Sequence, residues 1–213
     1  MGRIGAFRMK KFKTKKSEET YRRVLDSAIE LFTEESYEKT TMRAISQRSK
    51  LGLGALYYYF PSKESIVTAF YSQINEEISR DWNGQASEND SLSESISTFV
   101  NFKLEKLLPY RHLLRIILKE AVDPESSLSP LSSESRQALD SSLGIFESML
   151  EPSDSRRQFA KLLWLGHLGL IGLWIHKPDK AASAVTAFAD LAPFLILSTD
   201  LSSLGPWVDD LIP

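Results

Sequence analysis

The stretch KLGLGALYYYF, residues 50–60, places two glycines and three consecutive tyrosines within eleven positions. A helix that only completes a core carries its large residues every third or fourth position, which buries one stripe and leaves the rest in solvent. Three consecutive rings face three directions, so some of them must meet something other than the core. Pro61 ends this helix, because the residue before a proline is pushed out of the helical region.

The segment before this stretch predicts two more helices. Apolar residues recur at helical spacing between Val24 and Phe32, and a serine followed by acidic residues is typical of a helix start, which predicts a helix at about residues 18–35. Thr41 is expected to cap a short helix at about residues 42–49. A four-residue turn then leads into the tyrosine helix. Two short helices joined in this way after a supporting helix form a helix-turn-helix.

The rest of the chain also has helical periodicity, and no segment alternates apolar and polar residues with a period of two. We therefore predict an all-α fold of about nine helices. The long apolar run at residues 162–175 is shorter than the roughly 20 residues of a membrane span, so we expect a buried helix and no membrane partner. The helices after the tyrosine stretch are expected at about residues 62–82, 92–108, 110–122, 131–150, 155–176 and 180–198.

Charge is divided unevenly along the chain. Residues 1–63 hold 14 Lys and Arg against 7 Asp and Glu, and the remainder holds 12 against 21, so the two parts carry +7 and −9. A basic front end suits a polyanion, although a solvated basic tail is the alternative. The chain has no cysteine, which excludes disulfides and thiol catalysis. With no export signal evident, we expect a cytoplasmic protein; Met1 and Met9 are both candidate translation starts.

The segment TTMRAISQRSKLGLGALYYYFPSKESI, residues 40–66, resembles the DNA-binding segment of the tetracycline-repressor-like (TetR) transcriptional regulators. The likeness extends over about residues 17–77. Three positions depart from the family pattern: Lys50 stands at the usual turn glycine, Gly52 at the usual hydroxyl cap, and Tyr59 at the usual histidine. The matching positions are Thr41, Ile45, Leu51, Gly54, Leu56, Tyr57, Phe60, Lys63, Glu64 and Ile66.

The resemblance implies a DNA-binding domain at residues 17–77, with the helix-turn-helix at about residues 41–60, that inserts its second short helix into the major groove. A basic arm at residues 1–16 would reach the adjacent minor groove. The alternative for Tyr57 is a mainly buried ring with its hydroxyl at the rim. The residues expected to contact phosphates are Thr41, Lys50, Tyr57, Tyr59 and Lys63, and those expected to meet or closely approach bases are Arg43, Leu53, Gly54, Ala55 and Tyr58.

The resemblance also implies a homodimer built on the last two helices of a C-terminal ligand-binding and dimerisation domain, residues 78–213. Gly166, Gly169 and Gly172 support this, because glycines inside a helix cost about 1 kcal/mol each unless something approaches closely. We expect a partner helix there, contacted also by Phe188 and Ala192. The alternative is packing against a helix of the same subunit.

Aromatic residues of the same domain predict a mainly apolar ligand pocket, because ligand sites combine an apolar lining with few polar groups. An ordinary core would use the same residues, and a core histidine is the alternative for His167. The residues of the predicted pocket are Phe99, Phe102, His112, Phe146, Trp164, His167 and Trp174.

No motif of hydrolases, nucleotide-binding enzymes or metal sites occurs, so we expect neither an enzyme nor a cofactor or metal. The function predicted is a DNA-binding transcriptional regulator, a repressor released from a near-palindromic operator by a small hydrophobic or aromatic ligand. The alternative is a DNA-bound adaptor or architectural protein of the same fold, without an inducer, that acts through a protein partner.

Overall fold

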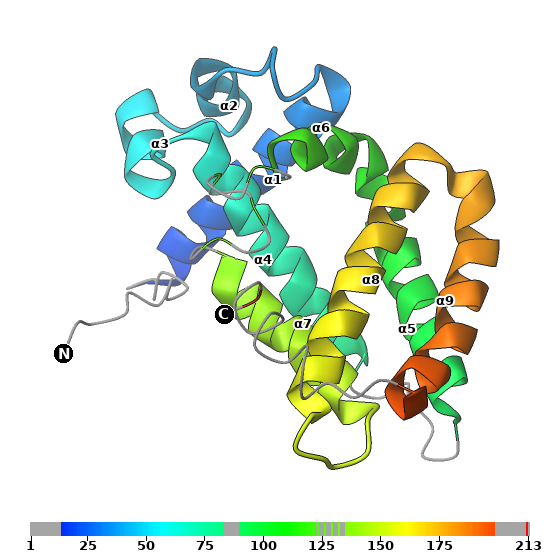
Figure 1. The fold of residues 1–213 in the computed structure, drawn as a ribbon. Coiled ribbons are helices and arrows are strands. Elements are labelled where there is room, and N and C mark those ends of the chain that lie inside the picture. The colour runs from blue at the N-terminus through cyan, green and yellow to red at the C-terminus, as the bar shows by residue number, and fades with distance from the viewer. Residues whose placement is uncertain are drawn as a thin grey trace. The chain divides into compact units, whose positions relative to one another are not determined.

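The structure, a computed structural model, describes residues 14–82, 90–121 and 135–198 together with Asp123, Ser126, Ser129, Ser132 and Ile212. These residues form nine α-helices and one 3-10 turn and no strand, which confirms the predicted all-α fold (Figure 1). The elements are α1 (Lys15–Glu34), α2 (Met42–Arg48), α3 (Leu53–Tyr59), α4 (Lys63–Trp82), α5 (Leu92–Leu107), η1 (Leu108–Tyr110), α6 (Arg111–Ala121), α7 (Arg136–Ser148), α8 (Arg156–His176) and α9 (Pro178–Ser198).

Most of these helices begin and end within two or three residues of the expected positions. The helix expected at residues 131–150 is shorter, since α7 spans only Arg136–Ser148. The last helix begins at Pro178 rather than at residue 180, because proline is favoured in the first turn, where a helix has no use for its missing N–H.

The chain divides into two compact units. The first contains the residues up to Ile74 together with His112–Gln137, and the second contains Asn75–Arg111 and Ala138–Pro213. The long helix α4 therefore contributes to both units, and α6 belongs to the first.

In the first unit, α1 supports the two short helices. Its start is capped by Thr14, whose side chain accepts a hydrogen bond from the Ser17 N–H. Its end is followed by Ser36, which takes a φ of 89° and so turns the chain away from the helix. The buried face of α1 includes Phe32, which is fully buried with Leu56 of α3 in the core of this unit.

In the second unit, α9 packs against both α5 and α8. The helix α5 starts with a capping box in which Ser91 and Glu94 satisfy each other's backbone N–H groups. Ser93 donates a hydrogen bond to Asp190 of α9 at 2.8 Å. Arg111 donates to the carbonyl of Ile175 at 2.9 Å, which satisfies an acceptor in the last turn of α8.

The helix α8 is long and apolar enough to cross a membrane by length and composition alone, and it is the one such helix among the described residues. It also has a buried face inside the second unit, where Trp164 and His167 are enclosed. This is the pattern of a core helix, as the sequence predicts.

Candidate nucleic-acid interface

The turn between α2 and α3 is a complete helix C-cap. The Lys50 N–H donates to the Gln47 carbonyl at 3.2 Å, and the Leu51 N–H donates to the Ser46 carbonyl at 3.0 Å. These two bonds are the Schellman pattern, which requires a left-handed residue after the cap. Lys50 occupies that position with a φ of 52°. Lys50 thus has the left-handed backbone of the glycine that usually stands in this turn, and its side chain is exposed.

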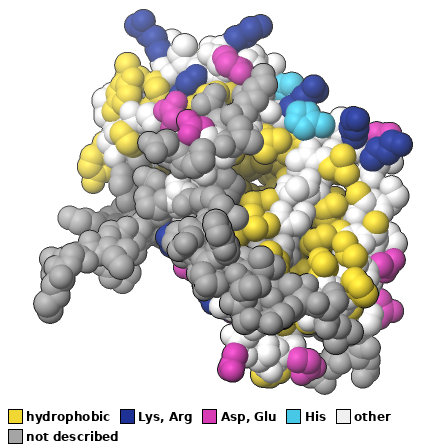
Figure 2. Space-filling view, viewed as in Figure 1, with side chains coloured by type: hydrophobic (Ala, Val, Ile, Leu, Met, Phe, Trp, Pro, Cys, Tyr) yellow, Lys and Arg dark blue, Asp and Glu magenta, His cyan; other side chains and the backbone are white. Residues whose placement is uncertain are grey.

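Helix α3 has one buried and one exposed face. Leu56 is fully buried, and the buried ring of Phe60 stacks on Tyr21 of α1 with 4.6 Å between ring centroids. Tyr58 is 75% exposed and Tyr57 48% exposed. Hydrophobic side chains consequently cover the outer side of α3 (Figure 2). The exposed positions predicted to contact or approach DNA are Leu53, Gly54, Ala55, Tyr57 and Tyr58.

Tyr59 is the half-buried member of the tyrosine run. Its hydroxyl shares a 3.1 Å hydrogen bond with the hydroxyl of Ser17, near the start of α1. Its ring lies edge-on to Tyr58 with 5.6 Å between centroids. Tyr59 therefore links α3 to the beginning of α1. The basic arm comes just before this point in the sequence. Most of that arm, residues 1–13, lies outside the described residues.

Helix α3 starts without a side-chain cap, as expected from Gly52. A β-carbon added to Gly52 or to Gly54 would meet nothing within 4 Å, so both stand at an open surface where a large partner can approach the backbone.

Thr41 caps α2, since its hydroxyl accepts from the Ala44 N–H at 3.1 Å and keeps its own proton for another acceptor. Lys63 is half-buried and donates to the Tyr37 carbonyl at 2.7 Å, with its ammonium 4.3 Å from the centre of the Tyr37 ring. Lys63 thus holds the α1–α2 connection in place. An ammonium has two further protons for a phosphate.

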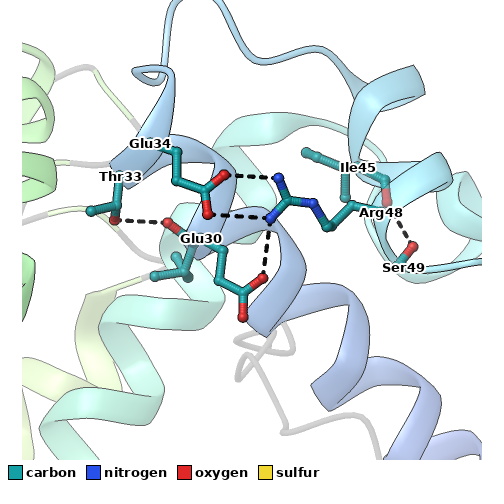
Figure 3. Close-up of polar contacts among 7 residues, drawn as sticks. Glu30, Thr33, Glu34, Ile45, Arg48 and Ser49 are labelled. Atoms are coloured by element: carbon teal, nitrogen blue, oxygen red, sulfur yellow. Dashed lines mark hydrogen bonds and ion pairs between the residues drawn. The ribbon is translucent and has the colours of Figure 1, made fainter.

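Arg48 fixes α2 to α1. Its guanidinium lies 2.8 Å from a carboxylate oxygen of Glu34 and 3.3 Å from one of Glu30 (Figure 3). The hydrogen bond from Arg48 lowers the pKa of the Glu34 carboxyl. Arg23 of α1 donates to the Ser49 carbonyl at 3.0 Å. Sequence reasoning missed these positioning residues, because no local pattern pairs charges that lie 14 or more residues apart. Arg43, by contrast, is exposed, which leaves it open to the predicted contact with bases.

Four of the predicted pocket residues form a buried cluster in the second unit. Phe99, Phe146, Trp164 and His167 are almost fully enclosed. The rings of Phe99 and Phe146 lie 5.3 Å apart, and the ring of His167 lies 5.4 Å from that of Phe146. We call these four residues together with Lys103 the aromatic cluster.

The other three pocket residues lie differently. Phe102 is half-buried, with its ring 5.7 Å from that of Trp82. Trp174 is buried near the end of α8. His112 is exposed at the start of α6 and belongs to the first unit, so the second unit's cluster does not include it.

Lys103 is a charged residue of the cluster that the sequence did not single out. Burial lowers the pKa of its ammonium to about 8. Burial, and after it the positive charge of Lys103, hold the pKa of His167 well below its usual value. Lys103 lies on the apolar stripe of α5, three residues after Val100 and four after Phe99, whereas Lys106 is only half-buried. The sequence reading considered aromatic residues and histidines for this site, which is why it passed Lys103 over.

The three glycines of α8 have different surroundings. A β-carbon on Gly166 would collide with the ring of Phe188, so this glycine is explained by α9 of the same chain. A β-carbon on Gly169 or Gly172 would meet nothing within 4 Å. Gly166 therefore packs against a helix of its own subunit, which is the alternative that the sequence left open. Gly169 and Gly172 remain open to contact with a second chain.

One predicted interface residue is misplaced. Ala192 is fully buried within its own chain, so the prediction that it faces a partner subunit is wrong. The exposed side of α9 instead carries Leu191, Phe194 and Leu195. The space-filling view shows an apolar face over α8 and α9 (Figure 2).

Residues 24–70 match the model of the family described as bacterial regulatory proteins of the tetR family. The matched segment contains the whole of α2 and α3 and the residues placed on the exposed surface above.

Relatives extend the likeness beyond this segment. The transcriptional repressor KstR of Mycolicibacterium smegmatis is 25% identical over 186 residues, which cover 85% of this chain and 89% of that protein. An uncharacterised regulator, YuxN of Bacillus subtilis, is 22% identical over 86% of this chain and 69% of its own.

Solved structures share the fold. A TetR transcriptional regulator from Rhodococcus sp. RHA1 has a TM-score of 0.65 at 20% identity, over 84% of this chain and 97% of that one. FadR from Bacillus subtilis, solved in complex with stearoyl-CoA, has a TM-score of 0.62 at 15% identity, over 81% and 97%. With the family match, the repressor relatives and the exposed recognition helix together, this chain is a DNA-binding transcriptional regulator of the TetR family.

Proposed function

We propose that the chain is a cytoplasmic, homodimeric repressor that binds a near-palindromic operator. The observation that carries the proposal is the outer face of α3, where Leu53, Ala55 and Tyr58 stand exposed on a helix anchored by buried Leu56. Apolar side chains on such a face suit contacts with thymine methyl groups in the major groove.

Phosphate contacts would come from the residues around α3. Lys50 is exposed at the turn, and Thr41, Tyr57, Tyr59 and Lys63 each carry a proton that a phosphate oxygen can accept. Contacts of this kind set affinity and make it depend on salt, whereas Arg43 and the face of α3 would select sequence.

The dimer would form through the apolar face of α8 and α9. Leu191, Phe194 and Leu195 are large apolar residues exposed in the single chain, and the backbone at Gly169 is open. Exposed apolar patches of this kind mark interfaces. We propose residues 17–77 as the DNA-binding domain and residues 78–213 as the domain for dimerisation and effector binding.

The effector would enter the aromatic cluster. FadR of Bacillus subtilis was solved with stearoyl-CoA, so a protein of this fold takes a ligand with a long apolar acyl chain. In the present chain the rings of Phe99 and Phe146 touch, so a ligand must separate them and move α5 relative to α7. A tenfold loss of operator affinity requires about 1.4 kcal/mol of coupling between the two sites.

The close ring contacts also favour a second candidate function. If the cluster admits no ligand, the protein is a DNA-bound adaptor that acts through a protein partner. Selection of bound duplexes from random DNA, followed by a release assay with candidate ligands on the selected operator, separates the two. The repressor predicts a two-fold symmetric operator and release by a small molecule. An unsymmetrical target would contradict the homodimer, and an operator complex that no ligand weakens would favour the adaptor.

A further inference from the structure

Lys103 is buried in the aromatic cluster with too few partners for a charged group. Its side chain is 4% exposed, and its ammonium donates one hydrogen bond, to the Asn75 side-chain oxygen at 3.3 Å. An ammonium has three protons to donate. No carboxylate pairs with it within the described part of the chain. A buried charge in this state is costly unless an anion completes its shell.

His167 presents a complementary group. It is fully buried, and its Nδ1 lies 3.2 Å from the Trp164 carbonyl. A carbonyl oxygen only accepts hydrogen bonds, so Nδ1 carries the proton in this contact. In a neutral imidazole Nε2 then has a lone pair and no proton. Nε2 is buried and has no partner among the described residues, which leaves an acceptor that a donor would satisfy.

The two groups lie in the same region of the cluster. Lys103 stands four residues after Phe99 on α5, so the two side chains share one face of the helix. The ring of Phe99 lies 6.2 Å from the ring of His167. The charge of Lys103 is also strong enough at His167 to help lower its pKa. A cation and a hydrogen-bond acceptor therefore lie among apolar rings, within reach of one small molecule.

We propose that the effector is an apolar hydroxy acid whose anionic oxygen pairs with the Lys103 ammonium and whose hydroxyl donates to His167 Nε2. Its carbon skeleton takes the place of the contact between Phe99 and Phe146. This rests on the proposed function, because it names the chemical class of the ligand for the same site. It also explains why two polar groups lie in a core that aliphatic residues would fill at lower cost.

Two probe sets test the class by calorimetry on the purified full-length protein. The flexible set is 3-hydroxydecanoate, decanoate and nonan-2-ol, and the aromatic set is 4-hydroxyphenylacetate, phenylacetate and 4-methylphenol. In each set the first probe carries both groups, the second only the acid and the third only the hydroxyl. In at least one set we expect the hydroxy acid to bind most tightly and the alcohol or phenol at least tenfold more weakly than the acid.

Variants assign the two contacts. Lys103→Met should remove the preference for the acids over the hydroxyl-only probe, and His167→Phe, which keeps a ring beside Phe146, should remove the preference of the hydroxy acid over the plain acid. Lys106→Met is the matched control on α5, since Lys106 pairs with Asp81 on the surface at 2.6 Å and should leave every affinity unchanged. Thermal unfolding of each variant checks that a lost preference does not come from a lost fold.

The proposal is overturned if no probe binds, if the acids and the hydroxyl-only probes bind alike, or if Lys103→Met keeps the preference for acids. An operator release assay tests the hydroxy-acid proposal separately from the proposed repressor function. Acids that bind through Lys103 without weakening the operator complex would support the site and contradict the repressor mechanism. If alcohols release the protein from its operator as strongly as acids do, the result would support the repressor mechanism. It would contradict the proposal that the effector is a hydroxy acid.

Discussion

Lys50 is a charged residue in a backbone conformation that glycine usually occupies. At a φ of 52° the β-carbon crowds the following carbonyl, at a cost on the order of 1 kcal/mol. Lys50→Gly should therefore raise the free energy of unfolding by up to about 1 kcal/mol, while it lowers affinity for every operator. Lys50→Ala is the control, because it removes the charge and keeps the strain. Urea unfolding measures the stability of each variant, and operator titration measures its affinity for DNA. If the Gly and Ala variants are equally stable, the backbone at position 50 is not strained.

Tyr58 is the most exposed of the three tyrosines and should act on sequence preference rather than on stability. Tyr58→Ala is expected to change the relative affinities of related operators by about tenfold, since each mismatched base pair in a site costs about 1–3 kcal/mol. Tyr58→Phe keeps the ring and tests the hydroxyl alone. Lys63→Ala should instead weaken all operators alike and reduce the salt dependence. If Tyr58→Ala instead lowers the affinity for all operators equally, Tyr58 contacts a phosphate rather than a base.

Lys103 should make the free energy of unfolding depend on pH in the alkaline range. Its pKa is about 8 in the folded chain and near 10.5 when exposed. Below about pH 8 both states hold the proton, so the burial cost of about 3 kcal/mol is present in full. Between pH 8 and 10.5 the unfolded state binds more protons, so stability rises with pH.

Lys103→Met should therefore be more stable than the wild type at pH 7, by a margin that narrows toward pH 10. Urea unfolding at several pH values measures this margin, with Lys106→Met as the control whose margin stays constant. Parallel pH profiles for the wild type and Lys103→Met would show that Lys103 has an ordinary pKa.

The exposure of the residues proposed to contact DNA could be predicted because their signals are local. The proline, the glycines and the tyrosine run occupy one short segment, and the buried and exposed faces of α3 follow from helical spacing around Leu56. The burial of Lys103 follows from the same spacing, because it lies on the apolar stripe of α5, but the partners of Lys103 and Arg48 could not be predicted in this way. Their environments depend on Asn75 and Glu34, which lie 28 and 14 residues away, and only tertiary packing brings those groups together.

At the scale of elements, the existence of the helices was predictable, but which neighbour each face of α8 and α9 contacts was not. A three-residue spacing of glycines in α8 indicates a close contact without saying which helix makes it. The structure divides that stripe, with Gly166 against Phe188 and Gly169 open. Ala192 was wrongly assigned because α9 packs on both α5 and α8, so its buried arc is wider than one helix contact requires.

The two glycines make a matched pair of tests for α8. Gly166→Ala should destabilise the folded chain by about 1–3 kcal/mol, because the Phe188 ring must shift to admit a methyl group. Gly169→Leu should leave the stability of the single chain nearly unchanged, because a β-carbon there meets nothing within 4 Å among the described residues, and should break the proposed dimer by forcing a side chain into its interface. Thermal unfolding and analytical ultracentrifugation measure the two effects. An intact dimer of Gly169→Leu would move the interface elsewhere on the chain.

At the scale of the whole molecule, the division of charge matches the division of tasks. The basic first 63 residues, with a formal charge of +7, include α3, and the acidic remainder carries −9 and includes the whole of the second unit. Operator affinity should accordingly fall steeply with salt, since each neutralised phosphate releases counterions. The acidic part would be repelled by the same duplex, which favours binding through the basic part of the chain that contains α3.

A dimer with one recognition helix per subunit should require two half-sites on one side of the duplex. Their centres are expected about one helical turn apart, roughly 34–36 Å. Inserting about five base pairs between them turns one half-site to the opposite side, so the wild-type dimer should lose most of its affinity, and inserting a full turn of about ten should restore part of it. Gly169→Leu, as a monomer, should bind a single half-site weakly and be indifferent to either insertion. Electrophoretic mobility shifts on the three duplexes measure this, and a wild-type protein that ignores the spacing would contradict the two-fold arrangement.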